Sequence, residues 1–123
     1  MVSAEDITAA VNRYLELVAT GTADDIVELY ADDATVEDPV GGEVHIGRHA
    51  IQAFYKNIEG AERTTELHEL RVAGHEAAFF FAITVDAGGH KVRIEPIDVM
   101  VFNSEGKITS MKAYWTFANA TQV

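Results

Sequence analysis

Apolar residues recur every three or four positions through the first half of the chain, the spacing of one helix face. The first such stretch begins at Ser3, which with Asp6 forms a pattern typical of a capping box, and it ends at Gly21. Its apolar positions are Ile7, Val11, Tyr14 and Val18. We therefore predict a helix between Ser3 and Gly21 with Tyr14 on its buried side.

Two further helices follow from the same kind of signal. Thr22 with Asp25 repeats the start pattern, and the second predicted helix runs to residues 32–33 with Tyr30 on its apolar face. The third predicted helix lies between residues 47 and 60. Its apolar stripe comprises Ile51, Phe54, Tyr55 and Ile58. Each of the three predicted helices thus carries one tyrosine on its apolar side.

The apolar period changes to two in the second half of the chain, as in strands. The predicted strands lie near residues 64–72, 76–86, 90–102 and 107–118. The stretch from Leu67 to Leu70 breaks the alternation and predicts a bulge. A shorter extended segment at residues 35–39 precedes the third helix. This order predicts one α+β domain over residues 1–123, with helices covering one face of a mostly antiparallel sheet.

The excess of acidic over basic residues argues against negatively charged binding partners. Twenty acidic against nine basic residues give a formal net charge of −11, which repels nucleic-acid backbones and anionic lipid. The N-terminus has no basic start, and no apolar run is long enough to span a bilayer, so we expect a cytoplasmic protein. There is no cysteine, and the five histidines lack metal-ligand spacing. We therefore expect neither a metal nor a cofactor, and neither a nucleic-acid nor a membrane partner.

Asp98 stands at a position where the pattern of its strand predicts an apolar residue. The even positions of residues 92–102 share one face with it, namely Val92, Ile94, Met100 and Phe102. Burial there disfavours the charged carboxylate, raises the pKa of Asp98 and favours a protonated acid that donates a hydrogen bond. A slipped register, or a buried Asp paired with the backbone, is the alternative that the pattern leaves open.

Asp38 ends the short extended segment, beside Pro39 and the pair Gly41 and Gly42. Glycines let the backbone turn tightly and let a ligand approach. A carboxylate that is mostly ionised near neutral pH and points into a cavity is a plausible general base. An ordinary turn-forming aspartate is the alternative.

The three tyrosines of the predicted helix stripes would bring their hydroxyl groups together if the helices pack over the sheet. Buried tyrosine hydroxyls need partners, and a chain of them polarises its terminal donor. Ordinary core tyrosines bonded to backbone or water are the alternative at each position.

The last predicted strand places Met111, Ala113, Trp115 and Phe117 on one face. With Val36, Phe54 and Met100 these residues would line a wide apolar pocket suited to a flat hydrophobic ligand. A plain sheet core has the same pattern.

Several segments of the chain resemble bacterial Δ5-3-ketosteroid isomerases of the nuclear transport factor 2-like superfamily. The resemblance covers nearly the whole chain in the same order, and its most specific part is Tyr-Ala-Asp-Asp-Ala-Thr-Val-Glu-Asp-Pro at residues 30–39. The other segments are residues 13–18, 47–48, 53–55, 97–100 and 113–115. Residues 59–92 fit the family less closely.

This resemblance implies both a fold and an assembly. The fold would be a cone-shaped α+β barrel, a strongly curved mixed sheet wrapped around three helices with a deep apolar pocket. The family usually forms a homodimer through the sheet. Its substrates are 3-oxo-Δ5-steroids, which the enzyme converts to 3-oxo-Δ4-steroids without a metal or cofactor.

The resemblance also implies roles for individual residues. Asp38 matches the general base that moves a proton from C4 to C6, and Tyr14 and Asp98 match the two donors to the steroid O3 as it becomes a dienolate. Tyr30 and Tyr55 match the supporting hydrogen-bond network. The expected substrate-binding residues are Val36, Phe54, Met100, Met111, Ala113 and Trp115.

Two other functions fit the same kind of pocket. A polyketide cyclase-like enzyme would abstract a proton beside a carbonyl but would lack the paired donors Tyr14 and Asp98. A non-catalytic module would bind a hydrophobic ligand without turnover, and an intact set of Tyr14, Asp38 and Asp98 argues against it.

Overall fold

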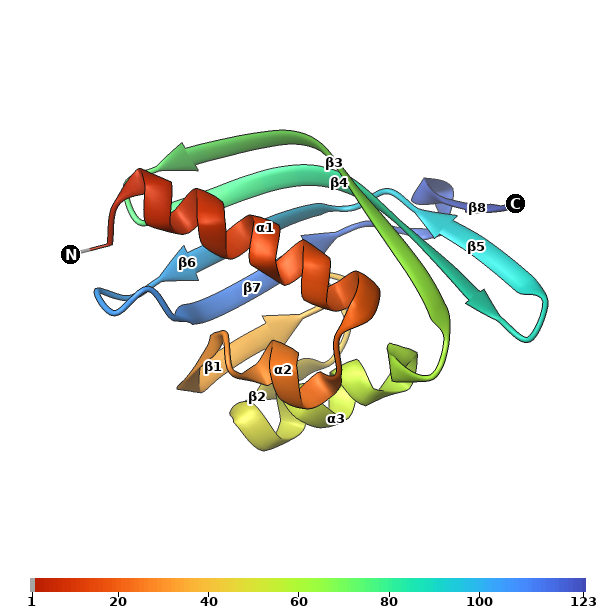
Figure 1. The fold of residues 1–123 in the computed structure, drawn as a ribbon, viewed down its shortest axis with the longest axis horizontal. Coiled ribbons are helices and arrows are strands. Elements are labelled where there is room, and N and C mark those ends of the chain that lie inside the picture. Colours follow the sequence, from red (N-terminus) through yellow and green to blue (C-terminus); the bar gives the residue numbers. More distant parts are fainter. Residues whose placement is uncertain (1) are drawn as a thin grey trace.

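One curved, mixed sheet of eight strands carries the fold, and helices lie along its hollow side (Figure 1). The computed structural model describes residues 2–123. The helices are α1 (Ala4–Thr20), α2 (Ala23–Val27), α3 (Arg48–Glu59) and a single 3-10 turn, η1 (Phe117–Asn119). The strands are β1 (Tyr30–Glu37), β2 (Val44–Ile46), β3 (Glu62–Ala73), β4 (Glu76–Ala87), β5 (His90–Ile94), β6 (Ile97–Phe102), β7 (Ile108–Tyr114) and β8 (Ala120–Gln122). The predicted α+β class with three helices is confirmed.

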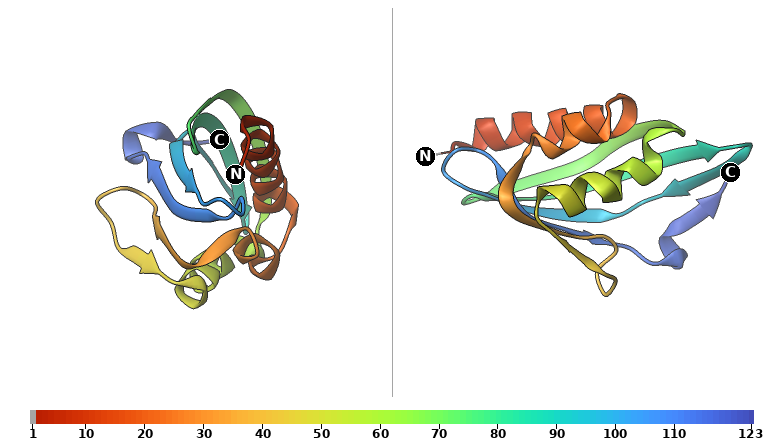
Figure 2. Two further views of the ribbon diagram at one scale, coloured as in Figure 1. Left: turned by 90° about the vertical axis from the view of Figure 1, so that its left-hand side faces the viewer. Right: turned by 90° about the horizontal axis from the view of Figure 1, so that it is seen from below.

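The strands pair in the order β2-β1-β7-β6-β4-β5-β8, with β3 also paired to β4. All neighbours are antiparallel except β1 and β7, which run parallel. The sheet is open rather than closed, so the expected barrel is wrong although the curved sheet around helices is right. Helix α1 packs along β3 and β4, and α3 packs along β1 and β2, so both helices lie on the same side of the curved sheet (Figure 2).

The first helix forms as its sequence predicts. Ser3 Oγ accepts a hydrogen bond from the Asp6 amide at 3.0 Å, and the Ser3 amide donates to Asp6 Oδ2 at 3.2 Å. This capping box satisfies two of the free amides at the start of α1. The predicted apolar positions Ile7, Val11 and Tyr14 are all buried. No helix within residues 2–123 is long and apolar enough to cross a membrane.

The second predicted helix is too long. Helix α2 ends at Val27, and Tyr30 begins strand β1 instead of extending a helix. The Ile108 amide donates to the Leu29 carbonyl at 2.9 Å, and Tyr30 lies opposite Ile108 in the parallel pair of β1 and β7. Sheet pairing therefore overrides the helical spacing of the apolar residues, as tertiary contacts often override local propensity.

The long strand predicted at residues 90–102 is two strands. Glu95 and Pro96 interrupt it, since proline has no amide to donate to a neighbouring strand. Strand β5 pairs with the second half of β4 and with β8, whereas β6 pairs with the first half of β4 and with β7. The predicted bulge is confirmed by the register shift between Leu67 and Glu69. The three-residue strands β2 and β8 were not predicted.

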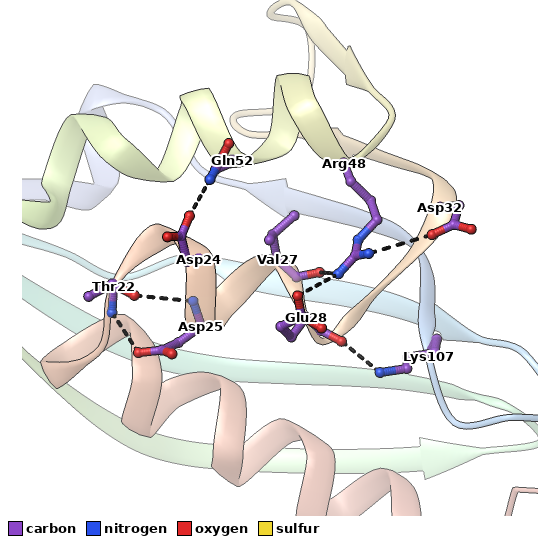
Figure 3. Close-up of polar contacts among 9 residues, drawn as sticks. All are labelled: Thr22, Asp24, Asp25, Val27, Glu28, Asp32, Arg48, Gln52 and Lys107. Atoms are coloured by element: carbon purple, nitrogen blue, oxygen red, sulfur yellow. Dashed lines mark hydrogen bonds and ion pairs between the residues drawn. The ribbon is translucent and has the colours of Figure 1, made fainter.

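Arg48, the first residue of α3, ties that helix to α2 and β1 (Figure 3). Its guanidinium donates to the Val27 carbonyl at 3.2 Å and pairs with Glu28 at 3.1 Å and with Asp32 at 3.6 Å. Each ion pair is largely exposed and adds little alone, but together they join three elements at one point.

Two more contacts complete this polar cluster. Gln52 on α3 donates to Asp24 on α2, and Lys107 donates to the Glu28 carbonyl at 2.7 Å (Figure 3). The cluster lies at the start of β1 and of α3. It therefore fixes Tyr30 and Tyr55, carried by those two elements, relative to each other.

Candidate active site

A pocket of about 180 Å³ lies between α1, α3 and the hollow side of the sheet. Its wall is mostly apolar, contributed by Val18, Phe54, Ile58, Phe81, Ile83, Val85, Ile94 and Pro96. The polar side chains in the wall are Tyr14, Asp38, Tyr55, Asn57 and Trp115. A mostly apolar cavity with a few polar groups is typical of a binding site for a hydrophobic small molecule.

Three tyrosine hydroxyls form a chain that ends at the pocket. Tyr30 on β1 and Tyr55 on α3 have their hydroxyl oxygens 2.6 Å apart, and those of Tyr55 and Tyr14 are 3.0 Å apart. Burial raises the pKa of all three phenols well above the usual value, so they stay protonated. The hydroxyls converge as the sequence predicts, although Tyr30 comes from a strand rather than a helix.

Asp98 is a buried acid and the second residue of β6. It is 1% exposed and lies opposite Phe79 on one side and Ala113 on the other. Met100 and Phe102 are buried on the same face, so the slipped register is excluded. Among residues 2–123, Asp98 Oδ1 has no hydrogen-bond partner. Burial raises the pKa of this carboxyl well above its usual value and the nearby Asp38 raises it further, so Asp98 holds a proton.

Asp38 follows the last residue of β1 and contributes to the pocket wall. The indole Nε1 of Trp115 donates to its Oδ1 at 2.7 Å, a contact that the sequence did not reveal. Burial raises the pKa of Asp38, while the Trp115 hydrogen bond and the neighbouring His45 lower it. The turn that follows is held by Glu37, which accepts from the Gly41 amide at 2.8 Å, so the Asp38 carboxylate is not occupied in forming it.

The two acids therefore sit in the same apolar region with different surroundings. Asp38 is partly exposed and has a hydrogen-bond donor, whereas Asp98 is fully buried and has none for its Oδ1. The surroundings of Asp38 therefore favour the charged carboxylate more than the surroundings of Asp98 do. Within residues 2–123, no group of three or more His, Cys, Asp and Glu is placed to hold a metal ion.

The remaining predicted site residues divide between the pocket wall and the core. Phe54 and Trp115 are in the wall. Four others are at most 1% exposed and belong to the core rather than to the wall, namely Val36, Met100, Met111 and Ala113. Phe117, predicted on the same face as Trp115, is 89% exposed because the strand ends at Tyr114.

Sequence reasoning missed the outer part of the wall. Phe81, Ile83 and Val85 alternate along β4, and Ile94 faces them from β5. The period of two in β4 was visible in the sequence, but its apolar face was not assigned to a pocket. Asn57, on α3 next to Ile58, was also missed, since nothing in the sequence separates it from an ordinary surface amide.

The family follows from a direct match. The model of the SnoaL-like domain matches residues 11–111. The chain belongs to the SnoaL-like family. This stretch contains all three residues of the expected catalytic set, Tyr14, Asp38 and Asp98.

One relative of this chain carries the name of a specific enzyme. The SnoaL-like chain is 54% identical over 111 residues to a protein from Nocardioides simplex named Steroid Delta-isomerase, and the match covers 89% of each protein. The resemblance to bacterial ketosteroid isomerases noted in the sequence is thereby confirmed.

Solved structures share the whole SnoaL-like fold. SalBIII, described as an epoxide hydrolase/cyclase-like enzyme in pyran ring formation in polyether salinomycin, superposes with a TM-score of 0.93 at 30% identity, covering 100% of both chains. RV0760c from Mycobacterium tuberculosis superposes with a TM-score of 0.90 at 22% identity, again over 100% of both chains. The second likeness shows the fold alone.

The buried acid makes stability depend on pH. Since the pKa of Asp98 is higher in the folded than in the unfolded chain, the folded protein binds this proton more tightly. That contribution is fully present below the unfolded pKa near 3.8 and is lost as pH rises toward the raised folded pKa. The variant Asp98→Asn carries no such proton. As pH rises, the wild type should therefore lose stability that the variant keeps. The difference between their free energies of unfolding should change in favour of the variant by up to about 1.4 kcal/mol for each pH unit.

Urea unfolding of both proteins between pH 4 and 8 measures this difference. The exposed Asp33→Asn controls for the loss of one surface charge. A difference between Asp98→Asn and the wild type that stays constant over this range would mean that Asp98 is ionised in the folded protein.

Proposed function

We propose that this protein isomerises 3-oxo-Δ5-steroids to 3-oxo-Δ4-steroids, with Asp38, Tyr14 and Asp98 as its catalytic residues. The observation that carries the proposal is an apolar pocket whose wall contains the partly exposed carboxylate of Asp38 and Tyr14, the end of a hydroxyl chain. The buried acid Asp98 is not in the wall, but it lies close enough to both groups for Asp38 to raise its pKa and for it to raise the pKa of Tyr14. The name of the relative from Nocardioides simplex supports the choice of substrate class.

Asp38 acts as the base. Its carboxylate takes the proton from C4, the electrons of that C–H bond form a dienolate, and the negative charge collects on O3. The protonated Asp38 then returns the proton to C6, so the double bond moves from C5–C6 to C4–C5 with no net gain or loss of atoms. The Trp115 indole donates to Oδ1, so we assign the proton transfer to Oδ2. A positioned base of this kind contributes about 10²–10⁴-fold in rate.

Tyr14 and Asp98 stabilise the dienolate by donating to O3. If Tyr30 donates to Tyr55 and Tyr55 to Tyr14, the Tyr14 hydrogen is left for the ligand and is polarised by the chain behind it. Asp98 supplies a second hydrogen because burial keeps it protonated. Donors fixed where charge develops in a dry site each contribute about 10²–10³-fold.

A cyclase-like reaction is the main rival, since SalBIII shares the fold at 30% identity. Proton abstraction beside a carbonyl needs the base, but it does not require two donors on one oxygen. The presence of both a buried acid and a tyrosine chain favours isomerisation through a held dienolate. It also argues against a module that only binds its ligand.

Loss of the base gives the most direct test. The variant Asp38→Asn should lower turnover of 5-androstene-3,17-dione at least about 100-fold, because an amide cannot take the C4 proton. The rise in ultraviolet absorbance of the conjugated product measures the rate. Titration of Asp38→Asn with the steroid product should show that the variant still binds steroid. The exposed Asp33→Asn, on strand β1 just before Asp38, is the control. Activity of Asp38→Asn within a few-fold of wild type would exclude Asp38 as the base.

Removing the indole donor should shift the pH dependence. The Trp115 hydrogen bond lowers the pKa of Asp38, so Trp115→Phe should raise it. Because the base acts when deprotonated, activity would then be lost at a higher pH as the solution is acidified. The acid limb of kcat/KM against pH measures this shift, with the exposed Tyr114→Phe as control. A limb unmoved in Trp115→Phe would show that this contact does not tune the base.

A homodimer formed through the sheet is part of the proposal. Phe80, Ile97 and Tyr114 lie side by side on β4, β6 and β7, and they point away from the helices. They are 37%, 47% and 47% exposed, which leaves an apolar stripe on the outer face. An exposed apolar stripe marks a protein contact surface. The resemblance to ketosteroid isomerases, which usually form homodimers, makes a second copy of this chain the proposed partner. The net charge of −11 argues against nucleic-acid and anionic-membrane partners, and a cytoplasmic location stays part of the proposal.

Placing a charge in the stripe should separate the copies. The variant Ile97→Lys should sediment as a monomer at concentrations where the wild type is a dimer, because two buried lysines would face each other across the axis. The control is Ile46→Lys, on β2 and 70% exposed. A monomeric wild type would refute the dimer, and a dimeric Ile97→Lys would refute this interface.

A further inference from the structure

The rim of the pocket carries one polar side chain that the proposed chemistry does not use. Asn57 lies on α3 one turn beyond Phe54 and next to Ile58, and all three contribute to the pocket wall. It is exposed, and its side chain makes no hydrogen bond to another residue within residues 2–123. The amide therefore offers both donors and an acceptor to a ligand.

The sheet register shows how far along β4 the outer part of the pocket lies from the buried acid. On β4, Phe79 pairs with Asp98, whereas Val85 pairs with Val92 of β5. The pocket wall continues along β4 from Phe81 to Val85. Six residues separate Phe79 from Val85, which corresponds to about 20 Å at roughly 3.3 Å per residue. The end at Val85 is therefore far from the buried acid.

Asn57 belongs to that far end. Arg63 on β3 pairs with Val85 in the sheet, and its Nη1 donates to the Ile58 carbonyl at 2.6 Å. This contact holds the last turn of α3 against the outer end of β4. Asn57 directly precedes Ile58 and lines the pocket, so it belongs to the part of the wall that this contact holds near the outer end of β4. The aliphatic side chains of the pocket wall include Val18, Ile58, Ile83, Val85 and Ile94.

We propose that Asn57 recognises an oxygen substituent at the end of the substrate opposite the reacting ketone. The inference rests on the proposed function and narrows its substrate class to 3-oxo-Δ5-steroids with a carbonyl or hydroxyl at the distal ring. An asparagine amide donates to a carbonyl and accepts from a hydroxyl, so it serves either group. Asn57 is thus a specificity-determining residue rather than part of the proton transfer.

The test compares substrates that differ only at the distal carbon. The measured quantity is kcat/KM for 5-androstene-3,17-dione divided by kcat/KM for 5-androsten-3-one, which lacks the distal oxygen. In Asn57→Leu this ratio should fall about 2- to 10-fold, the range expected for one net hydrogen bond. Lys56→Leu places the same side chain at the neighbouring exposed position, which is not in the pocket wall, and should leave the ratio at its wild-type value.

A second variant identifies the hydrogen-bond direction. Asn57→Asp keeps the shape of the side chain, but its carboxylate only accepts. It should lower the preference for the 17-carbonyl as Asn57→Leu does and keep the preference for 17β-hydroxy-5-androsten-3-one. A purely structural role of Asn57 would change all substrates alike and would leave these ratios unmoved.

The outcomes separate this inference from the proposed function. A wild-type ratio in Asn57→Leu would overturn the distal contact while the isomerase activity stands. No turnover of any substrate by the wild type would refute the proposed function instead. Titrations with 4-androstene-3,17-dione and 4-androsten-3-one then test the contact without catalysis. A ratio of affinities reduced in Asn57→Leu supports it, and an unchanged ratio overturns it.

Discussion

Removal of the Asp98 carboxyl from water is the constraint on which the site depends. An ionised carboxylate with an unpartnered oxygen in an apolar interior costs several kcal/mol, so the fold admits this side chain only as the neutral acid. Water is kept away because Phe79 and Ala113 flank this side chain in the sheet and it is only 1% exposed. The same dryness that keeps the proton on Asp98 strengthens every hydrogen bond made to a charge developing in the pocket.

The hydroxyl chain gives the site its rigidity. Tyr14, Tyr30 and Tyr55 come from three elements far apart in sequence, α1, β1 and α3. Their two hydrogen bonds join these elements from inside, while Arg48 joins α2, α3 and β1 from outside. A donor held from several directions needs little reorganisation when its acceptor becomes charged, and this is what makes a fixed dipole effective.

Much of this arrangement was predictable because it depends on local patterns. Capping signals and apolar stripes predicted α1 and α3, and alternation placed Asp98 on the buried face. The errors arose where distant pairing decided the structure. Tyr30 lies in a strand because it pairs with Ile108 of β7. Residues 90–102 form two strands because β5 pairs with the second half of β4 and β6 pairs with the first half. The Trp115 to Asp38 hydrogen bond spans 77 residues of sequence, and no local pattern marks such a contact.

The interruption at Glu95 and Pro96 separates the part of the sheet that buries Asp98 from the part that forms the outer pocket wall. Strand β4 is shared, but its first half and β6 hold the buried acid, whereas its second half and β5 form the outer wall of the pocket. Substitutions in β5 can therefore reshape the space around the distal part of a ligand without moving the register that buries Asp98. Within a single domain, the range of accepted molecules and the proton chemistry lie on pieces of the sheet that evolution can alter separately.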